Sequence, residues 1–252
     1  MRKLSVAIIT FNEESNIARA LKSVSFADEI VVVDSHSTDK TVEICKEFGA
    51  TVTLREFAGH VDQKNFALGL TEHDWVLSLD ADEVITDGLK DEIIQVLNAD
   101  NIKDGYKMPR LAFYLGRWIK HSGWYPDYKT RLVNKTKAKW VGIDPSDRLE
   151  LDGALGTFKN DFLHYTYQDV AHHLRTINSY TSITAERLFE KGKKTCVLDL
   201  TVRPFLVLIK KYFLKLGFLD GIPGLVIAIT TAFYTFSKYL KLRELWIKKE
   251  NS

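Results

Sequence analysis

The sequence contains few of the residues that mark several common classes of protein. It has only two cysteines, Cys45 and Cys196, too few for a disulfide framework, so we expect two reduced thiols in a cytosolic protein. Its seven histidines show no spacing with cysteine that fits a zinc site. Neither a Gly-x-Gly-x-x-Gly fingerprint nor a Gly-x-x-x-x-Gly-Lys-Ser/Thr loop occurs. A dinucleotide-binding or P-loop site is therefore not expected.

The first hundred residues alternate between strand-like and helix-like patterns. The chain opens directly on an apolar run, without the leader of a secreted protein. Amphipathic segments with helical spacing follow each such run. The predicted strands are Leu4–Thr10, Glu29–Asp34, Thr51–Leu54 and Trp75–Asp80. Buried strands that alternate with helices are typical of an α/β fold, in which helices cover both faces of a Rossmann-like, mostly parallel sheet.

The last of these strands ends in the most informative residues of the chain. Asp80 and Asp82 stand two positions apart, with Glu83 beside them. Two carboxylates so close repel each other unless a cation lies between them. Such oxygen ligands suit Mg²⁺ or Mn²⁺, which completes its shell with phosphate oxygens and water. The pattern predicts a metal-assisted enzyme for a nucleotide-activated substrate; the alternative is a solvated loop in which Asp82 caps a helix.

Two other predicted strands also end in polar residues. Thr10-Phe11-Asn12-Glu13 closes the first, and the stretch from Asp34 to Asp39 closes the second. Because ligands bind at the carboxyl ends of strands in open α/β sheets, the three polar ends are expected to converge. Their convergence favours the functional interpretation of the carboxylates over the solvated loop.

Residues 104–165 change character. They are rich in aromatic residues, among them Trp124 and Tyr125, and also contain several glycines and prolines. We expect short strands and irregular loops over the end of the sheet, with aromatics that form either a sugar-binding wall or ordinary core. A catalytic domain over residues 1–165, followed by a helical region over 166–252, is the predicted organisation.

The C-terminal region combines basic and apolar residues. The residues from Lys191 to Ser252 include 12 Lys or Arg and 4 Asp or Glu, which gives this segment a net charge of +8 in a chain whose net charge is +2. The 17 residues from Gly221 to Ser237 are uncharged. The sequence predicts helices over residues 169–191, 203–218 and 222–249. We expect the last two to lie in or on the inner membrane leaflet; the alternative is a homodimer interface or a packed hairpin. Because the basic residues interleave with Phe, Leu and Ile, nucleic-acid binding is not expected.

These motifs resemble those of inverting family 2 glycosyltransferases of the GT-A fold. Among them, the chain is most similar to lipopolysaccharide core-biosynthesis β-glucosyltransferases. The resemblance covers nearly the whole chain. Its residues are 5–14, 31–41, 63–67, 75–83, 125–132 and 217–221.

The resemblance implies roles for individual residues at the donor site. Asp80 and Asp82 would flank the metal ion, with Asp82 as the direct ligand. Lys64 would approach the diphosphate, and Asp34 would receive the uracil or ribose. The remaining residues implied to contact the nucleoside are Thr10, Asn12 and Glu13.

The resemblance also implies a general base and an acceptor site. Close family members show Val-His-Glu where this chain has Asp144-Pro145-Ser146-Asp147, so Asp147 is the expected base and Asp144 the alternative. Arg131 matches a basic family position and would orient acceptor phosphates. Trp124 and Tyr125 are the expected acceptor-binding aromatics.

The activity implied is transfer of a hexose, expected to be glucose, from a UDP-sugar to a lipid-linked saccharide. The expected acceptor is heptose of the lipopolysaccharide inner core, at the cytoplasmic face of the inner membrane. Three alternatives stay open: a polyprenyl phosphate acceptor, a nucleotidyltransferase and a non-catalytic membrane-bound scaffold. A nucleotidyltransferase would show a Gly-rich basic loop after the first strand, where this chain has Asn12-Glu13-Glu14.

Overall fold

The computed structural model describes residues 2–143 and 147–251, which form two compact units. Unit 1 comprises Met1–Leu111 and Asp127–Tyr165, and unit 2 comprises Ala112–Pro126 and Thr166–Ser252. The expected boundary at residue 165 reappears between the units. The stretch Ala112–Pro126, however, groups with the C-terminal helices, whereas we had expected it in the catalytic domain.

Unit 1 is built on a twisted sheet whose first half is parallel. The strands β1 (Leu4–Thr10), β2 (Glu29–Asp34), β3 (Thr51–Leu54) and β4 (Trp75–Asp80) have the predicted bounds and stand in the order β3-β2-β1-β4. The sheet continues through strands from the second half of the unit. In order they are β8 (Asp127–Asn134), β6 (Gly105–Tyr114), β12 (Phe162–Tyr165) and β5 (Glu83–Ile85). The predicted α/β fold class is confirmed.

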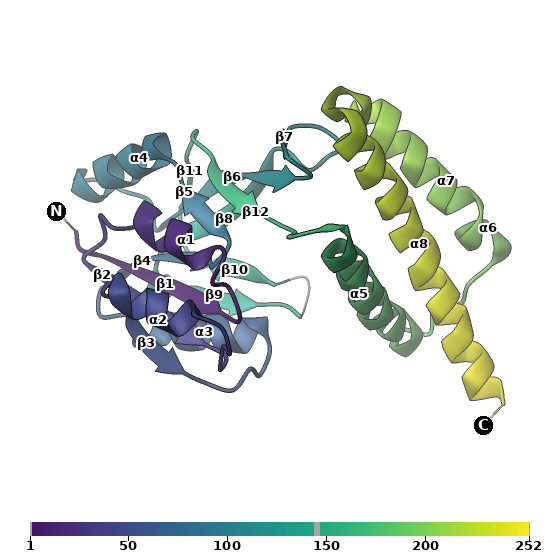
Figure 1. Cartoon of the computed structure of the whole chain (residues 1–252), viewed down its shortest axis with the longest axis horizontal. Coiled ribbons are helices and arrows are strands. Elements are labelled where there is room, and N and C mark those ends of the chain that lie inside the picture. Colours follow the sequence, from purple (N-terminus) through teal and green to yellow (C-terminus); the bar gives the residue numbers. More distant parts are fainter. Residues whose placement is uncertain (1, 144–146, 252) are drawn as a thin grey trace. The chain divides into compact units, whose positions relative to one another are not determined.

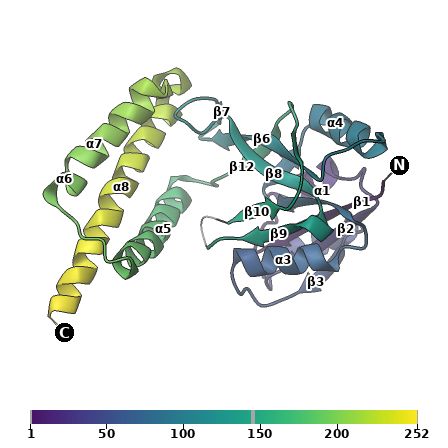
Figure 2. The same ribbon diagram turned by 180° about the vertical axis from the view of Figure 1, so that it is seen from behind.

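Helices cover both faces of the parallel strands, as Figures 1 and 2 show from opposite sides. Successive side chains of a strand point to opposite faces. Val6 and Ile8 of β1 therefore enter one core, whereas Ala7 enters another with Val33 and Val76. The first core is completed by α1 (Ile17–Ser23), α2 (Thr41–Glu47) and α4 (Asp87–Asn98), and the second by α3 (His60–Leu70).

The region from 104 to 165 is more regular than expected. Strand β6 is ten residues long and pairs with β8, so it extends the main sheet. Most of its residues are buried, and Lys107, Arg110 and Phe113 are only partly so. The shorter elements are β7 (Arg117–Ile119), the 3₁₀ turn η1 (Lys135–Lys137), β9 (Ala138–Val141), β10 (Arg148–Leu151) and β11 (Leu155–Thr157).

Unit 2 is mostly helical. Helix α5 (Val170–Glu190) matches the predicted helix over 169–191 and packs along α8 (Gly221–Glu250). The predicted single helix over 203–218 is instead divided into several segments. They are α7 (Val202–Ile209), the π-helical turn η2 (Lys210–Leu214) and the 3₁₀ turn η3 (Gly217–Asp220), and the short helix α6 (Val197–Leu200) precedes them. Helices α7 and α8 lie side by side (Figure 1).

A close backbone approach explains why the predicted helix ends early. Leu216 adopts a left-handed conformation with φ of 53°, which stops the preceding turn. A Cβ atom on Gly224 would lie 1.8 Å from the carbonyl oxygen of Gly217, so only glycine permits this contact. Among the described residues, one helical stretch, Gly217–Glu250, is long and apolar enough to cross a membrane by length and composition, a criterion that a buried core helix also meets.

Candidate active site

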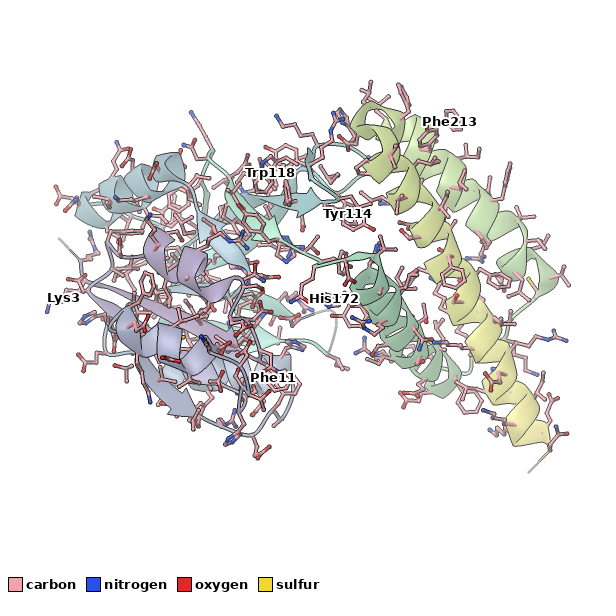
Figure 3. All side chains as sticks on the ribbon, in the orientation of Figure 1. Lys3, Phe11, Tyr114, Trp118, His172 and Phe213 are labelled. Carbon is pink, nitrogen blue, oxygen red and sulfur yellow. The ribbon has the colours of Figure 1, made fainter. Side chains whose placement is uncertain are left out.

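The loops after β1 and β2 are joined at the carboxyl edge of the sheet. Asn12, in a left-handed conformation with φ of 54°, donates its backbone N–H to Ser37 Oγ at 2.8 Å. Its Oδ1 accepts from the backbone N–H of Thr38 at 2.8 Å. Phe11 is 57 % exposed at this edge (Figure 3). Asn12 thus connects the loop after β1 to the loop after β2 through these hydrogen bonds.

Asp34 is fully buried beneath these loops. Its Oδ2 accepts from Thr10 Oγ1 at 2.6 Å and from Ser37 Oγ at 2.5 Å, while its Oδ1 accepts from the Ser37 backbone N–H at 2.8 Å. Thr10 is buried as well. Both carboxylate oxygens of Asp34 are bonded inside the protein here, and the expected contact of Asp34 and Thr10 with a nucleoside stays a prediction. The pair shapes the loop that follows β2.

Glu13 lies close to the metal-binding carboxylates predicted from the sequence. Burial, together with the charges of Asp82, Asp39 and Asp80, raises the pKa of Glu13 to about 7, against a hydrogen bond from Asn16 that lowers it. The Asn16 Nδ2 donates to Glu13 Oε2 at 2.7 Å. The ends of β1 and β4 are therefore electrostatically coupled, as the convergence of polar strand ends predicted.

Asp80, at the end of β4, is held by two cations. Lys64 Nζ lies 2.9 Å from its Oδ1, and Arg131 Nη2 lies 3.0 Å from its Oδ2. Burial opposes ionisation, but the charges of Lys64 and Arg131 outweigh it and hold the pKa of Asp80 far below its ordinary value. Asp80 is thus ionised with both oxygens occupied, which leaves Asp82 as the better candidate for direct metal coordination.

Asp82 occupies the turn after β4. Its Oδ2 lies 3.1 Å from Nε2 of His164, and its backbone carbonyl accepts from the N–H of Tyr165 at 3.0 Å. Both interactions depend on β12, which pairs antiparallel with β5 so that His164 stands opposite Glu83. The side chain of Asp82 keeps 21 % of its surface exposed, so one strand fixes this carboxylate without enclosing it.

Lys64 of α3 connects the metal-site carboxylates to the predicted base. Its Nζ lies 2.9 Å from Asp80 Oδ1 and 2.8 Å from Asp147 Oδ2, and 4.3 Å from the ring centroid of Trp140. Burial favours the neutral amine, but the charges of Asp80 and Asp147 outweigh this and raise the pKa of Lys64. The lysine is therefore a buried cation between two carboxylates.

Asp147 is ionised in this arrangement. Burial raises its pKa, but the adjacent Lys64 more than compensates and holds the pKa of Asp147 below its ordinary value. A carboxylate bound this way is a weak proton acceptor until the lysine moves. Asp144, the alternative base, lies outside the described residues. The assignment of Asp147 as the base stays a prediction.

Arg131 is almost fully buried. Its Nη2 donates to Glu83 Oε1 at 2.6 Å and also to Asp80. Burial favours the neutral form of Arg131, but the charges of Glu83 and Asp80 outweigh burial and raise the pKa of Arg131. Glu83 in turn accepts the backbone N–H of Asp80 at 3.1 Å. The expected role of Arg131 in orienting acceptor phosphates does not fit this placement, because its guanidinium group faces carboxylates of its own unit. Arg131 and Glu83 position Asp80.

Three residues of this cluster escaped sequence reasoning in their present roles. Glu83 stood next to the two aspartates but showed no sign of being a buried partner for Arg131. His164 and Trp140 reach the site only through strand pairing and loop folding, so no local sequence pattern could predict that they belong to it. Trp124 and Tyr125, the expected acceptor aromatics, belong to unit 2, where the Trp124 ring lies 5.6 Å from that of Tyr114.

The donor set fits a divalent cation only in part. Among the described residues, no group of three His, Cys, Asp or Glu side chains is arranged to hold a metal ion. Mg²⁺ is commonly held by one or two carboxylates and completed by phosphate oxygens. Asp82, partly exposed beside the already neutralised Asp80, fits that role when a diphosphate supplies further ligands.

Comparison with known proteins shows the family of the chain that carries this cluster. Residues 5–149 match the model of Glycosyl transferase family 2. This chain belongs to glycosyltransferase family 2. An uncharacterized glycosyltransferase of Rickettsia prowazekii is 34 % identical to the transferase over 268 residues, which cover 100 % of this chain and 90 % of the relative.

Two further similarities concern pathway and fold. The lipopolysaccharide core biosynthesis glycosyltransferase LpsC of Rhizobium meliloti is 25 % identical over 246 residues, covering 95 % of the transferase and 91 % of LpsC. The structure of residues 1–349 of Staphylococcus aureus TarS in complex with UDP-GlcNAc aligns with a TM-score of 0.50 at 15 % identity, covering 98 % of this chain and 92 % of that one. The second likeness shows a shared fold, and the expected family and GT-A fold are confirmed.

Proposed function

We propose that this transferase moves a hexose, expected to be glucose, from a UDP-sugar to heptose of a lipid-linked inner-core saccharide. The observation that carries the proposal is the connected cluster of Asp82, Asp80, Lys64 and Asp147 at the carboxyl edge of the sheet. It combines an accessible carboxylate for a cation, a buried lysine and a carboxylate for proton transfer. The name of LpsC supports the acceptor class.

The cluster suits departure of a nucleoside diphosphate. Charge grows on phosphate oxygens as the bond to the sugar breaks, and preorganised positive groups stabilise that charge. Mg²⁺ or Mn²⁺, when bound, would supply Lewis-acid stabilisation of the leaving diphosphate. Lys64 contributes a second positive charge, already desolvated and fixed beside Asp80. The leaving group then needs no protein acid.

The same lysine couples donor binding to the base. A diphosphate that attracts the Lys64 ammonium draws it from Asp147, which lies 2.8 Å away in the described structure. The pKa of Asp147 would then rise, because the largest influence that lowers it is the charge of Lys64. Asp147 becomes a better acceptor for the proton of the acceptor hydroxyl once donor is bound. The ion pair thereby restrains the base in the absence of donor.

Release of nucleoside diphosphate from a panel of UDP-sugars tests the activity directly. We expect turnover with UDP-glucose and Mg²⁺ or Mn²⁺, and its loss in EDTA with recovery on adding metal. A delipidated inner-core saccharide should accelerate release, whereas polyprenyl phosphate should not. Full activity in EDTA would contradict the metal proposal, and absence of turnover with every sugar would favour a non-catalytic scaffold.

We also propose that unit 2 binds the cytoplasmic face of the inner membrane from one side. Leu214 and Ile222 are 74 % and 76 % exposed, and the side chain of Phe213 is exposed at the same end of the α7–α8 pair (Figure 3). Lys210 and Lys215 are exposed beside them. Further exposed apolar residues of α7, η3 and α8 are Phe205, Leu206, Phe218, Leu219, Leu225, Ile229 and Phe233.

Exposed apolar side chains beside lysines are typical of a helical surface that binds at the membrane interface. Each basic residue near anionic lipid contributes about 1 kcal/mol to the binding free energy. Liposome flotation with and without anionic lipid tests it. We expect L214E and I222E to lose binding and F57E, a substitution at an exposed phenylalanine of unit 1, to keep it. An intact protein that stays soluble beside anionic liposomes but dimerises would show that this surface is a protein interface.

A further inference from the structure

Unit 2 contains a cavity between α5 and α8, separate from the carboxylate cluster of unit 1. Its volume is about 180 Å³. Ligand pockets for whole drug-sized molecules measure about 300–1,000 Å³, so this cavity is too small for a nucleotide-sugar and suits one end of a ligand. The lining residues are Trp124, Tyr167, His173, Thr176, Ile177, Tyr180, Thr230, Thr231 and Tyr234.

The threonines of the cavity do not offer hydrogen-bond donors to a ligand. Thr176 Oγ1 donates to the carbonyl of His172 at 3.0 Å. Thr230 Oγ1 and Thr231 Oγ1 donate to the carbonyls of Val226 and Ile227 at 2.8 and 2.6 Å. Because each hydroxyl is committed to its own helix, the threonines contribute methyl groups to the lining, as Ser and Thr do in apolar helical surroundings.

Two further polar groups of the lining are engaged within the protein. The hydroxyl of Tyr234 lies 2.9 Å from that of Thr184, and His173 Nδ1 lies 2.7 Å from the Tyr114 hydroxyl. Burial lowers the pKa of His173, so this imidazole is neutral. No Lys, Arg, Asp or Glu is present among the described residues that line the cavity. A sugar ring or a phosphate would leave polar groups unpaired here, at a cost that disfavours both.

The geometry points to a hydrocarbon chain: we propose that this cavity holds the end of one lipid chain. Aromatic faces and methyl groups match it, and on α8 the lining residues Thr230 and Tyr234 stand next in sequence to the exposed apolar residues Ile229 and Phe233. The identity of that lipid as the acceptor rests on the proposed function. Chain binding itself does not, since it is measured without donor, metal or turnover.

Photolabelling of the full-length protein tests the proposal. The probes are a fatty acid and a polyprenol, each carrying a diazirine at the chain end, so that the two arms distinguish an acyl lipid from an isoprenoid lipid. We expect labelled peptides to contain residues 167–180 and 230–234 with one or both probes, and excess decanol to protect them. Label confined to the exposed surface of α7 and η2 would overturn the proposal, as would protection by glucose.

Matched variants separate the cavity from the surface. T231F fills the cavity from α8 and T176F fills it from α5, whereas S179F adds the same ring at an exposed position of α5. We expect both filling variants to weaken probe binding by about tenfold or more, because the ring displaces several buried methylene groups of the chain, and S179F to bind like wild type. Circular dichroism checks folding. Unchanged labelling in a folded T231F or T176F protein would refute the assignment.

Discussion

Replacing Lys64 by methionine removes one charge from the centre of the carboxylate cluster. Lys64 retains only 7 % side-chain exposure and lies within 3 Å of both Asp80 and Asp147. Breaking a buried ion pair by removing one partner typically costs about 3–5 kcal/mol, because it leaves an uncompensated charge. Asp80 keeps Arg131, and both carboxylates are partly solvated, so we expect K64M to lower the free energy of unfolding by about 3 kcal/mol at pH 7.

The pH dependence of this loss identifies its cause. The pKa values of Asp80 and Asp147 are lowered in the folded state, so their pairing with Lys64 stabilises the protein above the ordinary aspartate pKa of 3.8. That stabilisation disappears as the pH falls through their lowered values. The difference between K64M and wild type should therefore be greatest near neutral pH and shrink in acid.

Urea unfolding measures the effect. We expect a lower midpoint with an unchanged slope, which indicates a change in stability and not in the surface exposed on unfolding. K46M, at an exposed position near the end of α2, is the control and should unfold like wild type. A K64M protein as stable as wild type at pH 7, or equally destabilised at pH 7 and in acid, would refute the ion-pair reasoning.

Three further predictions concern the site. D82N should fold normally but release nucleoside diphosphate roughly 10²-fold more slowly, the scale of losing a major transition-state contact; normal turnover would exclude Asp82 as a metal ligand. D147N should bind donor, measured by calorimetry, yet lose roughly 10²–10⁴-fold in transfer, and normal transfer would assign the base elsewhere. Glu13 has a raised pKa of about 7, so its contribution to stability is lost as pH rises through that value, and E13Q should gain stability over wild type from pH 5 to 8. Equal unfolding midpoints of E13Q and wild type across that pH range would contradict the raised pKa of Glu13.

Much of unit 1 could be predicted because its parallel strands are buried on both faces. A strand covered on two sides needs a near-continuous apolar run, and that composition marked β1, β2 and β4 with their observed bounds. The edge strand β3, which has no fully buried residue, was also predicted at its observed bounds. The polar residues at the ends of these runs then predicted the carboxyl edge as the site, and the pairing of Thr10 with Asp34 and of Ile9 with Asp80 shows that these strand ends meet. Local composition was therefore sufficient to predict the strands, and the location of the site at this edge stays a prediction.

The partners of the site residues depended on tertiary structure. Lys64 reaches Asp147 across 83 positions of sequence, and Arg131 reaches Asp80 across 51. Asp34, which is expected at the nucleoside, is buried, and Thr10 and Ser37 satisfy its carboxylate. A sequence pattern shows which positions are apolar and with what period apolar positions recur along the chain. It does not show which distant charge will arrive beside a given position, and in a largely buried site that neighbour decides whether a carboxylate binds a metal, accepts a proton or holds a loop in place.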